Sequence, residues 1–428
     1  MMNIYFYTLG CKVNQYETEA MGELFKSKGY VIVNDPKLAN VIIVNSCTVT
    51  ASSDQKTRQA VRRFKRNNQD AIVVLCGCMP QAFPEKSAEL FEADIITGNK
   101  NHKMILDLVE KNLSTKAQII HIPEHENDEP FEEFEVDNFE GRTRAFIKIQ
   151  DGCNRFCSYC IIPYSRGRSR SRSLENLSVE LDKIKAAGYK EVVLVGINFC
   201  CYGLDIGKTF VDPIELACEK GFDRVRIGSL EFDNISDEAI ERLKKLKNFC
   251  PQFHMSLQSG CDKTLKAMNR HYTSAEYLEL CNKLRAAWPD ATITTDLMVG
   301  FSGETDEDFE ASLEFAKTVG FEKIHVFPYS VRPGTNAAKL KDQVDPAVKN
   351  SRAAKAIEVA DKLRQDFLKA QIGSTVTVLC ETYKKGVVSG YTKNYTPVKF
   401  ESDIDLNNTL VNVKITDTYE DCCIGIKA

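Results

Sequence analysis

Short apolar runs in the N-terminal part of the chain alternate with longer stretches of helical spacing. Residues 4–7, 41–44 and 72–75 are β-branched or aromatic, which is typical of buried strands. Residues 17–28 and 54–66 repeat their apolar positions at the period of an amphipathic helix. Strands that alternate with helices predict an α/β fold with an open, mostly parallel sheet, whose ligands gather beyond the carboxyl ends of the strands.

The middle of the chain repeats this alternation. Six strand-like runs, each followed by a helical stretch, predict a full or partial parallel (β/α) barrel: residues 146–149, 192–195, 224–227, 254–257, 292–299 and 324–327. A charged segment over 346–371 predicts a closing helix. From residue 373 onward, apolar and polar residues alternate between turn signals, which predicts a small antiparallel β-barrel.

An abrupt change of charge separates the first two parts. Residues 124–140 hold nine acidic residues and no Lys or Arg, whereas residues 141–172 hold eight basic residues and one acidic residue. We therefore expect an amino-terminal α/β domain, an acidic linker, a partial barrel and a carboxy-terminal barrel. Their expected bounds are 1–123, 124–140, 141–366 and 367–428.

Composition narrows the class of protein. With 428 residues and a net charge of -4, the chain is long enough for two or three cores, and any surface that binds a polyanion must be a local patch. No apolar run reaches the roughly 18 residues of a membrane span, and no charged signal-peptide head is seen. We expect a cytoplasmic protein without a membrane partner. Its 16 cysteines then indicate metal or cluster ligation rather than disulfides.

Three cysteines stand close together directly after the first strand of the predicted barrel. Cys153, Cys157 and Cys160 are spaced CxxxCxxC. Three thiolates hold three irons of a 4Fe-4S cube and leave the fourth iron open to the amine and carboxylate of an amino acid. A zinc knuckle that lacks its fourth ligand is the alternative, but zinc sites usually use paired CxxC units.

Each of the three N-terminal strands is also followed closely by a cysteine: Cys11, Cys47 or Cys78. Neighbouring parallel strands end on the same edge of a sheet, so these three thiols are expected to converge. For any one of them alone, a buried structural cysteine is the simpler interpretation. Cys76 lies inside the third run, points the other way from its neighbours and is expected in the core.

The CxxxCxxC run, with Tyr159 before its third cysteine, resembles the radical S-adenosylmethionine (SAM) superfamily. The resemblance implies a 4Fe-4S cluster on Cys153, Cys157 and Cys160, from which an electron cleaves bound SAM to a 5′-deoxyadenosyl radical. Residues 9–17, 45–50 and 76–81 resemble the amino-terminal domain of the methylthiotransferases. That likeness implies a second, auxiliary 4Fe-4S cluster on Cys11, Cys47 and Cys78.

The resemblance to the methylthiotransferases extends over nearly the whole chain. It includes residues 257–260, 268–273, 295–305 and 325–335, and the tail resembles a TRAM domain, an RNA-binding barrel. Some positions depart from the family pattern: Gly228 and Phe232 replace the usual Ser and Pro, and Cys261 stands where Ser is common. Cys200 and Cys201 are also unexpected. We interpret these three extra thiols as incidental, with a role in sulfur handling as the alternative.

The family has branches that act on isopentenylated adenosine in tRNA, on threonylcarbamoylated adenosine in tRNA, and on an aspartate of a ribosomal protein. Residues 11–17, 327–330 and 390–395 look most like the threonylcarbamoyl branch. The implied reaction replaces C2–H by C2–SCH3 on the modified adenosine directly 3′ of the anticodon. The other two branches remain as alternatives, together with a non-catalytic RNA-binding iron–sulfur protein.

By this resemblance one SAM methylates sulfur carried on the auxiliary cluster, and a second SAM supplies the radical. No catalytic residue is assigned beyond the two clusters, and an electron donor such as a flavodoxin or ferredoxin is implied. The candidate SAM-binding residues are Tyr159, Gly196, Asn198, Ser229, Gln258, Arg270 and Asp296.

Binding of tRNA requires local positive charge. The sequence offers two basic clusters, one after the radical motif and one on the helix after Cys47. For the cluster on the helix, a solvated helix face is an equally good explanation. Tyr383, Tyr391 and Tyr395 are expected either to stack on bases or to fill the core of the small barrel. The candidate tRNA contacts are Arg166, Arg168, Arg170 and Arg172 after the radical motif, and Arg62 and Arg63 on the helix after Cys47.

Overall fold

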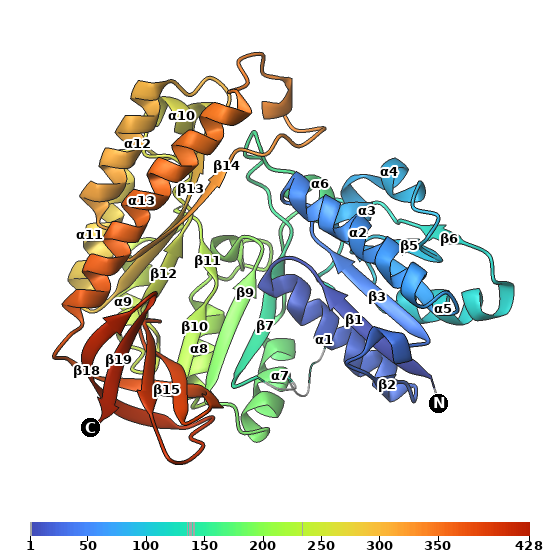
Figure 1. Ribbon diagram of the computed structural model, residues 1–428, viewed down its shortest axis with the longest axis horizontal. Helices are drawn as coiled ribbons and strands as arrows, with labels where there is room; N and C mark the ends of the chain where they lie inside the picture. Colours follow the sequence, from blue (N-terminus) through green and yellow to red (C-terminus); the bar gives the residue numbers. More distant parts are fainter. Residues whose placement is uncertain (1, 135, 137–138, 140–141, 233) are drawn as a thin grey trace.

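The computed structural model describes residues 2–134, 136, 139, 142–232 and 234–428. Three parts follow one another along the chain: an N-terminal α/β layer, a central open barrel and a small C-terminal β-barrel (Figure 1). The predicted acidic linker 124–140 and the predicted boundary at residue 141 lie partly outside the described residues. No helix in the described part of the chain is long and apolar enough to cross a membrane.

The N-terminal layer is a six-stranded, entirely parallel sheet in the order β2-β1-β3-β4-β5-β6. Helices cover both faces, so β3 and β4 are buried along their whole length. The three predicted strands are confirmed, and three short strands were not predicted: β2 and β6 at the edges, and β5 between β4 and β6. The elements are β1 (Asn3–Thr8), α1 (Lys12–Ser27), β2 (Val31–Ile32), β3 (Val41–Ser46), α2 (Ala51–Asn67), β4 (Ile72–Gly77), α3 (Cys78–Ala82), α4 (Pro84–Ala88), β5 (Ile95–Thr97), α5 (Met104–Thr115) and β6 (Ile119–His121).

The central part is a partial barrel, as predicted. Its sheets β10-β9-β7-β8 and β11-β12-β13-β14 follow each other directly, because only Gly228 separates β10 from β11. All pairings are parallel except that of β8. The strands are β7 (Arg144–Asp151), β8 (Arg170–Ser171), β9 (Glu191–Gly196), β10 (Arg224–Ile227), β11 (Ser229–Leu230), β12 (Gln252–Met255), β13 (Thr292–Val299) and β14 (Lys323–Pro328).

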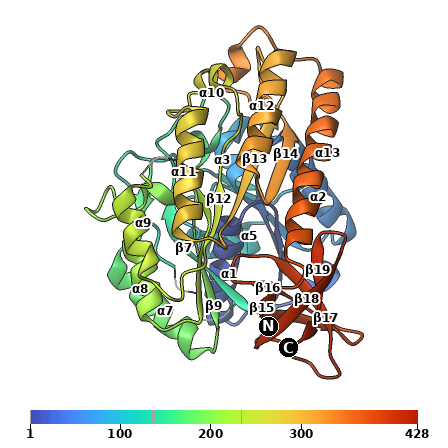
Figure 2. The same ribbon diagram turned by 90° about the vertical axis from the view of Figure 1, so that its left-hand side faces the viewer.

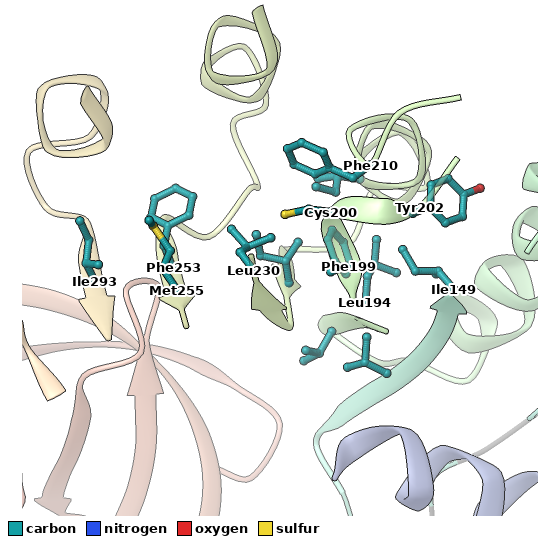
Figure 3. Packing of buried hydrophobic residues seen from close by; sticks show 14 of the residues in the cluster. Ile149, Leu194, Phe199, Cys200, Tyr202, Phe210, Leu230, Phe253, Met255 and Ile293 are labelled. Atoms are coloured by element: carbon teal, nitrogen blue, oxygen red, sulfur yellow. The ribbon is translucent and has the colours of Figure 1, made fainter. Parts of the chain in front are cut away.

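Helices line the outer side of these strands (Figure 2). One continuous apolar core joins the two sheets to the helices, and Figure 3 shows part of it around Leu194, Phe199 and Phe253. Val13 and Tyr16 of α1 belong to this core too, so α1 joins the N-terminal layer to the barrel. The helices are α6 (Ile162–Arg166), α7 (Leu174–Ala186), α8 (Asp212–Glu219), α9 (Asp237–Lys244), α10 (Asp262–Ala267), α11 (Ser274–Ala287), α12 (Asp306–Val319) and α13 (Pro346–Ala370).

The C-terminal part is a closed barrel in the order β15-β16-β17-β19-β18. All its pairings are antiparallel, as predicted, except the β17–β19 pairing, which is parallel. The strands are β15 (Thr375–Lys384), β16 (Val387–Thr392), β17 (Pro397–Glu401), β18 (Leu410–Tyr419) and β19 (Cys422–Lys427).

Buried arginines fasten this barrel to the central part. Arg224 donates hydrogen bonds to the backbone oxygens of Tyr391 (2.8 Å) and Thr377 (2.7 Å). The rings of Tyr391 and Tyr395 stack with centroids 4.5 Å apart, and the Arg144 guanidinium lies over both. These two tyrosines therefore serve a contact between parts of the chain, whereas Tyr383 packs against the core of the small barrel.

Candidate active site

The CxxxCxxC cysteines lie in the loop that leaves the carboxyl end of β7 and leads into α6. Gly152 opens this loop with φ +70°, and a Cβ there would lie 1.9 Å from the backbone oxygen of Arg168. Only glycine fits where the loop crosses the returning chain. Phe156 also has a positive φ, and its backbone oxygen accepts a hydrogen bond from the Asn269 side chain at 3.1 Å. The loop is thus held in one shape around its thiols.

Nitrogen donors face these thiols. Asn198 Nδ2 lies 3.5 Å from Cys153 Sγ, and Arg270 Nη1 lies 3.5 Å from Cys157 Sγ. Burial raises the pKa of Cys153 to about 11, and burial also raises the pKa of Cys160. Apolar burial disfavours bare thiolates, whereas N–H donors suit sulfur atoms that are bound to iron. The donor set therefore fits an iron–sulfur cluster.

A cavity of about 290 Å³ opens directly above these cysteines. Two buried oxygens on its wall, Asn198 Oδ1 and Gln258 Oε1, have no hydrogen-bond partner among the described residues. Gln258 also adopts φ +69°, a strained conformation for a residue with a side chain. Unpaired buried polar atoms are costly in a finished core but are expected where a polar ligand binds.

The structure brings five of the seven candidate SAM residues to this cavity, namely Tyr159, Asn198, Gln258, Arg270 and Asp296. It does not bring Gly196 and Ser229 there. Ser229 is exposed in β11. Gly196 leaves room for Gln150, whose side-chain oxygen accepts a hydrogen bond from the Asn198 backbone at 2.8 Å.

Two wall residues were not singled out from the sequence. Glu231 forms an ion pair with Arg270, and the backbone oxygen of Ser256 accepts a second hydrogen bond from the same guanidinium at 2.8 Å. Both residues directly follow a barrel strand, β11 or β12. Their position at the carboxyl end of a strand is the sequence signal that could have identified them.

The second set of cysteines lies at one edge of the N-terminal sheet. Cys11 precedes α1, Cys47 follows β3, and Cys78 begins α3 directly after β4. Since β1, β3 and β4 are neighbours in the sheet, their carboxyl ends bring the three thiols together, as strand order predicted. Burial raises the pKa of Cys78 to about 12, the Arg166 charge opposes this, and Cys47 and Cys11 raise the pKa further. Cys76 is buried in the core, as expected.

In the described part of the chain, no three His, Cys, Asp or Glu side chains stand close enough together to share a single metal ion. The ligands of a four-iron cube each bind a different iron and so stand farther apart.

The cavity extends from the first set of cysteines to the loop of the second. Val49 and Thr50, which follow Cys47, form part of its wall. This contact is fixed by the loop after β14, where Arg332 donates to Thr48 Oγ1 (2.8 Å) and pairs with Asp54 (2.6 Å). The loop that carries Cys47 therefore borders the cavity above Cys153, Cys157 and Cys160.

Most of the first predicted tRNA cluster is buried and paired within the protein. Arg166 binds Glu17 and Asp151, and Arg172 binds Glu180. Arg170 binds Asp151 as well. The prediction that Arg166, Arg170 and Arg172 contact phosphates is therefore wrong, because carboxylates from other elements use these charges.

The remaining candidate arginines are exposed. Arg168 lies over the Phe156 ring with its guanidinium 4.8 Å from the centroid. Arg62 pairs with Glu92 at 3.3 Å, and Arg63 lies over the Phe64 ring. These three side chains remain available to a phosphate backbone.

The three extra thiols have different surroundings. Cys200 is buried and donates to the backbone oxygen of Glu231 at 3.1 Å. Cys201 is buried beside it, and Cys261 donates to Asp308 at 3.4 Å. None of the three lines the cavity above Cys153, Cys157 and Cys160.

Two family models match the chain: residues 147–316 match the Radical SAM superfamily, and residues 3–98 match Uncharacterized protein family UPF0004. The solved structure of the radical SAM methyltransferase TsrM from Kitasatospora setae, with cobalamin and a [4Fe-4S] cluster bound, superposes with a TM-score of 0.58. It covers 91% of this chain and 81% of TsrM at 14% identity, which supports the fold alone.

Curated relatives match over nearly their full length. Threonylcarbamoyladenosine tRNA methylthiotransferase MtaB of Bacillus subtilis is 38% identical over 97% of this chain and 94% of its own. MtaB of Thermotoga maritima is 37% identical over 94% of this chain and 92% of its own length. The tRNA-2-methylthio-N(6)-dimethylallyladenosine synthase of Pelotomaculum thermopropionicum is 36% identical over 95% of this chain and 93% of its own length. These relatives, together with the CxxxCxxC loop at the carboxyl end of β7 in a partial barrel, show that the chain belongs to the methylthiotransferase family of radical SAM enzymes.

Proposed function

We propose that this protein is a tRNA threonylcarbamoyladenosine methylthiotransferase, which replaces C2–H of the modified adenosine by C2–SCH3. The observation that carries the proposal is one cavity: the CxxxCxxC thiols line it, and Val49 and Thr50, from the loop that follows Cys47, form part of its wall. A methylthio donor and a radical must meet at the same carbon atom, so their sites must open into one space. Curated relatives of both tRNA branches are similar to the chain, and those named for threonylcarbamoyladenosine reach 38% identity.

The radical SAM family uses a 4Fe-4S cluster and SAM. In this chain Cys153, Cys157 and Cys160 would hold the cluster, and when bound it supplies the electron that cleaves SAM. The unpaired oxygens of Asn198 and Gln258 would accept hydrogen bonds from SAM. Glu231 and Ser256 bind Nη2 of Arg270, and this keeps Nη1 directed at the Cys157 sulfur. Tyr159 and Asp296 complete the SAM-binding wall.

The auxiliary 4Fe-4S cluster would be held by Cys11, Cys47 and Cys78. Cys47 and Cys78 are buried whereas Cys11 is exposed, so this site opens on the side of Cys11. A flavodoxin or ferredoxin would supply the electrons. We expect the enzyme to act in the cytoplasm, where tRNA is found.

The substrate tRNA would contact the exposed arginines Arg168, Arg62 and Arg63 and the C-terminal barrel, which we take as an RNA-binding TRAM-like domain. We assign the parts as residues 1–123 for the auxiliary cluster, 124–140 for the linker, 141–366 for the radical chemistry and 367–428 for RNA binding.

The decisive experiment supplies the anaerobically reconstituted protein with reductant, SAM and one of two tRNAs. We expect about eight irons per chain and a methylthio mass gain on threonylcarbamoyladenosine by nucleoside mass spectrometry. A gain on isopentenyladenosine alone would assign the protein to the other tRNA branch. Binding of tRNA without 5′-deoxyadenosine formation would identify a non-catalytic iron–sulfur protein.

The Arg168→Gln variant should bind tRNA more weakly. Each phosphate contact on a duplex contributes a slope of about 0.9 to the dependence of log affinity on log salt, and on a single strand about 0.7. Loss of the Arg168 contact should lower the slope by this amount in a filter-binding titration. Lys317→Gln on α12 removes another exposed charge on the outer face and serves as the control. Equal slopes for Arg168→Gln and the unmodified protein would rule out the contact.

A further inference from the structure

Arg166 is a fully buried arginine between the two cluster sites. It ends α6 in the barrel, and α6 packs against α3, which begins with Cys78. Its four Nη–H groups are all used: Nη1 binds Glu17 (2.8 Å) and Asp151 (3.0 Å), and Nη2 binds Asn14 (3.0 Å) and Glu17 (3.0 Å). The guanidinium therefore has a fixed position.

The fifth donor of this guanidinium is not used. Arg166 Nε is buried and has no hydrogen-bond partner among the described residues. Both carboxylates that bind Arg166 are also paired with Lys148, Glu17 at 2.7 Å and Asp151 at 2.6 Å. The Arg166 charge is therefore not the sole partner of either carboxylate. An unpaired buried N–H is costly unless a further acceptor binds there.

Arg166 is linked to an auxiliary cysteine by Asn14. Asn14 Oδ1 accepts hydrogen bonds from both Arg166 and the Cys11 thiol, the latter at 3.3 Å. The same arginine thus reaches the Cys11 sulfur through Asn14, and its helix packs against the helix that begins with Cys78.

We propose that Arg166 is a positioning residue of the auxiliary cluster: its buried charge and free Nε–H stabilise the anionic sulfur of the cluster, and its four other hydrogen bonds fix the cluster relative to the radical site. This inference rests on the proposed auxiliary cluster on Cys11, Cys47 and Cys78. Buried positive charge and hydrogen bonds to sulfur raise the reduction potential of an iron–sulfur cluster. Loss of Arg166 should therefore make the auxiliary cluster harder to reduce.

The test uses the full chain with Cys153, Cys157 and Cys160 replaced by Ala, so that iron is held at the auxiliary site alone. The midpoint potential of the cluster is measured by electron paramagnetic resonance during a redox titration. We expect Arg166→Gln to shift the midpoint to a more negative value. Arg166→Lys retains the charge but not the fork of donors, and we expect it to shift the midpoint less.

Arg172→Gln is the matched control, because Arg172 is also fully buried and paired with a carboxylate, Glu180, but its hydrogen bonds among the described residues do not reach Asn14 or a ligand cysteine. We expect no shift for this variant. An unchanged midpoint in Arg166→Gln, or an equal shift in Arg172→Gln, would overturn the inference. If Arg166→Gln holds no iron, its midpoint potential cannot be measured and Arg166→Lys becomes the test. An unchanged midpoint potential in Arg166→Lys would then overturn the inference. If the parent without Arg166 substitution binds no iron, the auxiliary cluster itself is refuted.

Discussion

Replacement of Cys11, Cys47 and Cys78 together by Ala should abolish methylthio transfer while the protein continues to cleave SAM. The two thiol sets belong to different parts of the fold, and the loop of Cys153 is held by Gly152 and Asn269 rather than by the N-terminal sheet. We therefore expect the iron content to fall from about eight to about four per chain. In the same sample, 5′-deoxyadenosine should still form, and nucleoside mass spectrometry should find no methylthio product.

Cys76→Ala is the control for this experiment. Cys76 lies two residues before Cys78 but is buried in the apolar core of the sheet, so the change should leave iron content and product unaltered. Two results would contradict the assignment: methylthio product from the triple variant, or an iron content that stays near the unmodified value. Loss of 5′-deoxyadenosine as well would mean that the two sites do not act separately.

Gly77→Ala should be among the most destabilising single substitutions in the chain. Gly77 has φ +94°, and a Cβ there would lie 2.5 Å from Asn45 Oδ1 and 2.6 Å from the backbone of Ser46. The strained conformation costs about 1–3 kcal/mol, and overpacking of the buried strand adds about 1–3 kcal/mol. Because Cys78 follows directly, we also expect loss of iron from the auxiliary site.

Gly188→Ala separates the two causes. Gly188 has φ +87°, but nothing lies within 4 Å of the position of its Cβ, so this variant should show backbone strain alone. Urea unfolding of the iron-free proteins measures both free energies of unfolding. Equal losses for Gly77→Ala and Gly188→Ala would show that the close approach to Ser46 has no effect.

Local patterns predicted the features that depend on local sequence. Strand runs are visible because β3 and β4 are buried on both faces, and convergence of Cys11, Cys47 and Cys78 follows once their strands are neighbours. The CxxxCxxC set could be predicted because its three cysteines lie within one loop and their spacing can be read directly from the sequence.

Features that depend on distant partners were missed or misread. Arg166 resembled a phosphate ligand because its partner Glu17 lies 149 residues away. Glu231 was overlooked because β11, which positions it, is only two residues long. The parallel pairing of β17 with β19 depends on closure of the whole small barrel, which no local pattern reveals.

The ion pair of Arg332 with Asp54 also has a consequence for biosynthesis. It joins residues 278 positions apart. A ribosome makes the chain from its N-terminus, so all six proposed ligand cysteines have left the ribosome before Arg332 is made. The wall formed by Val49 and Thr50 is therefore fixed late. The growing chain therefore passes through a stage in which both thiol sets have been made but the ion pair that holds the loop after Cys47 has not yet formed.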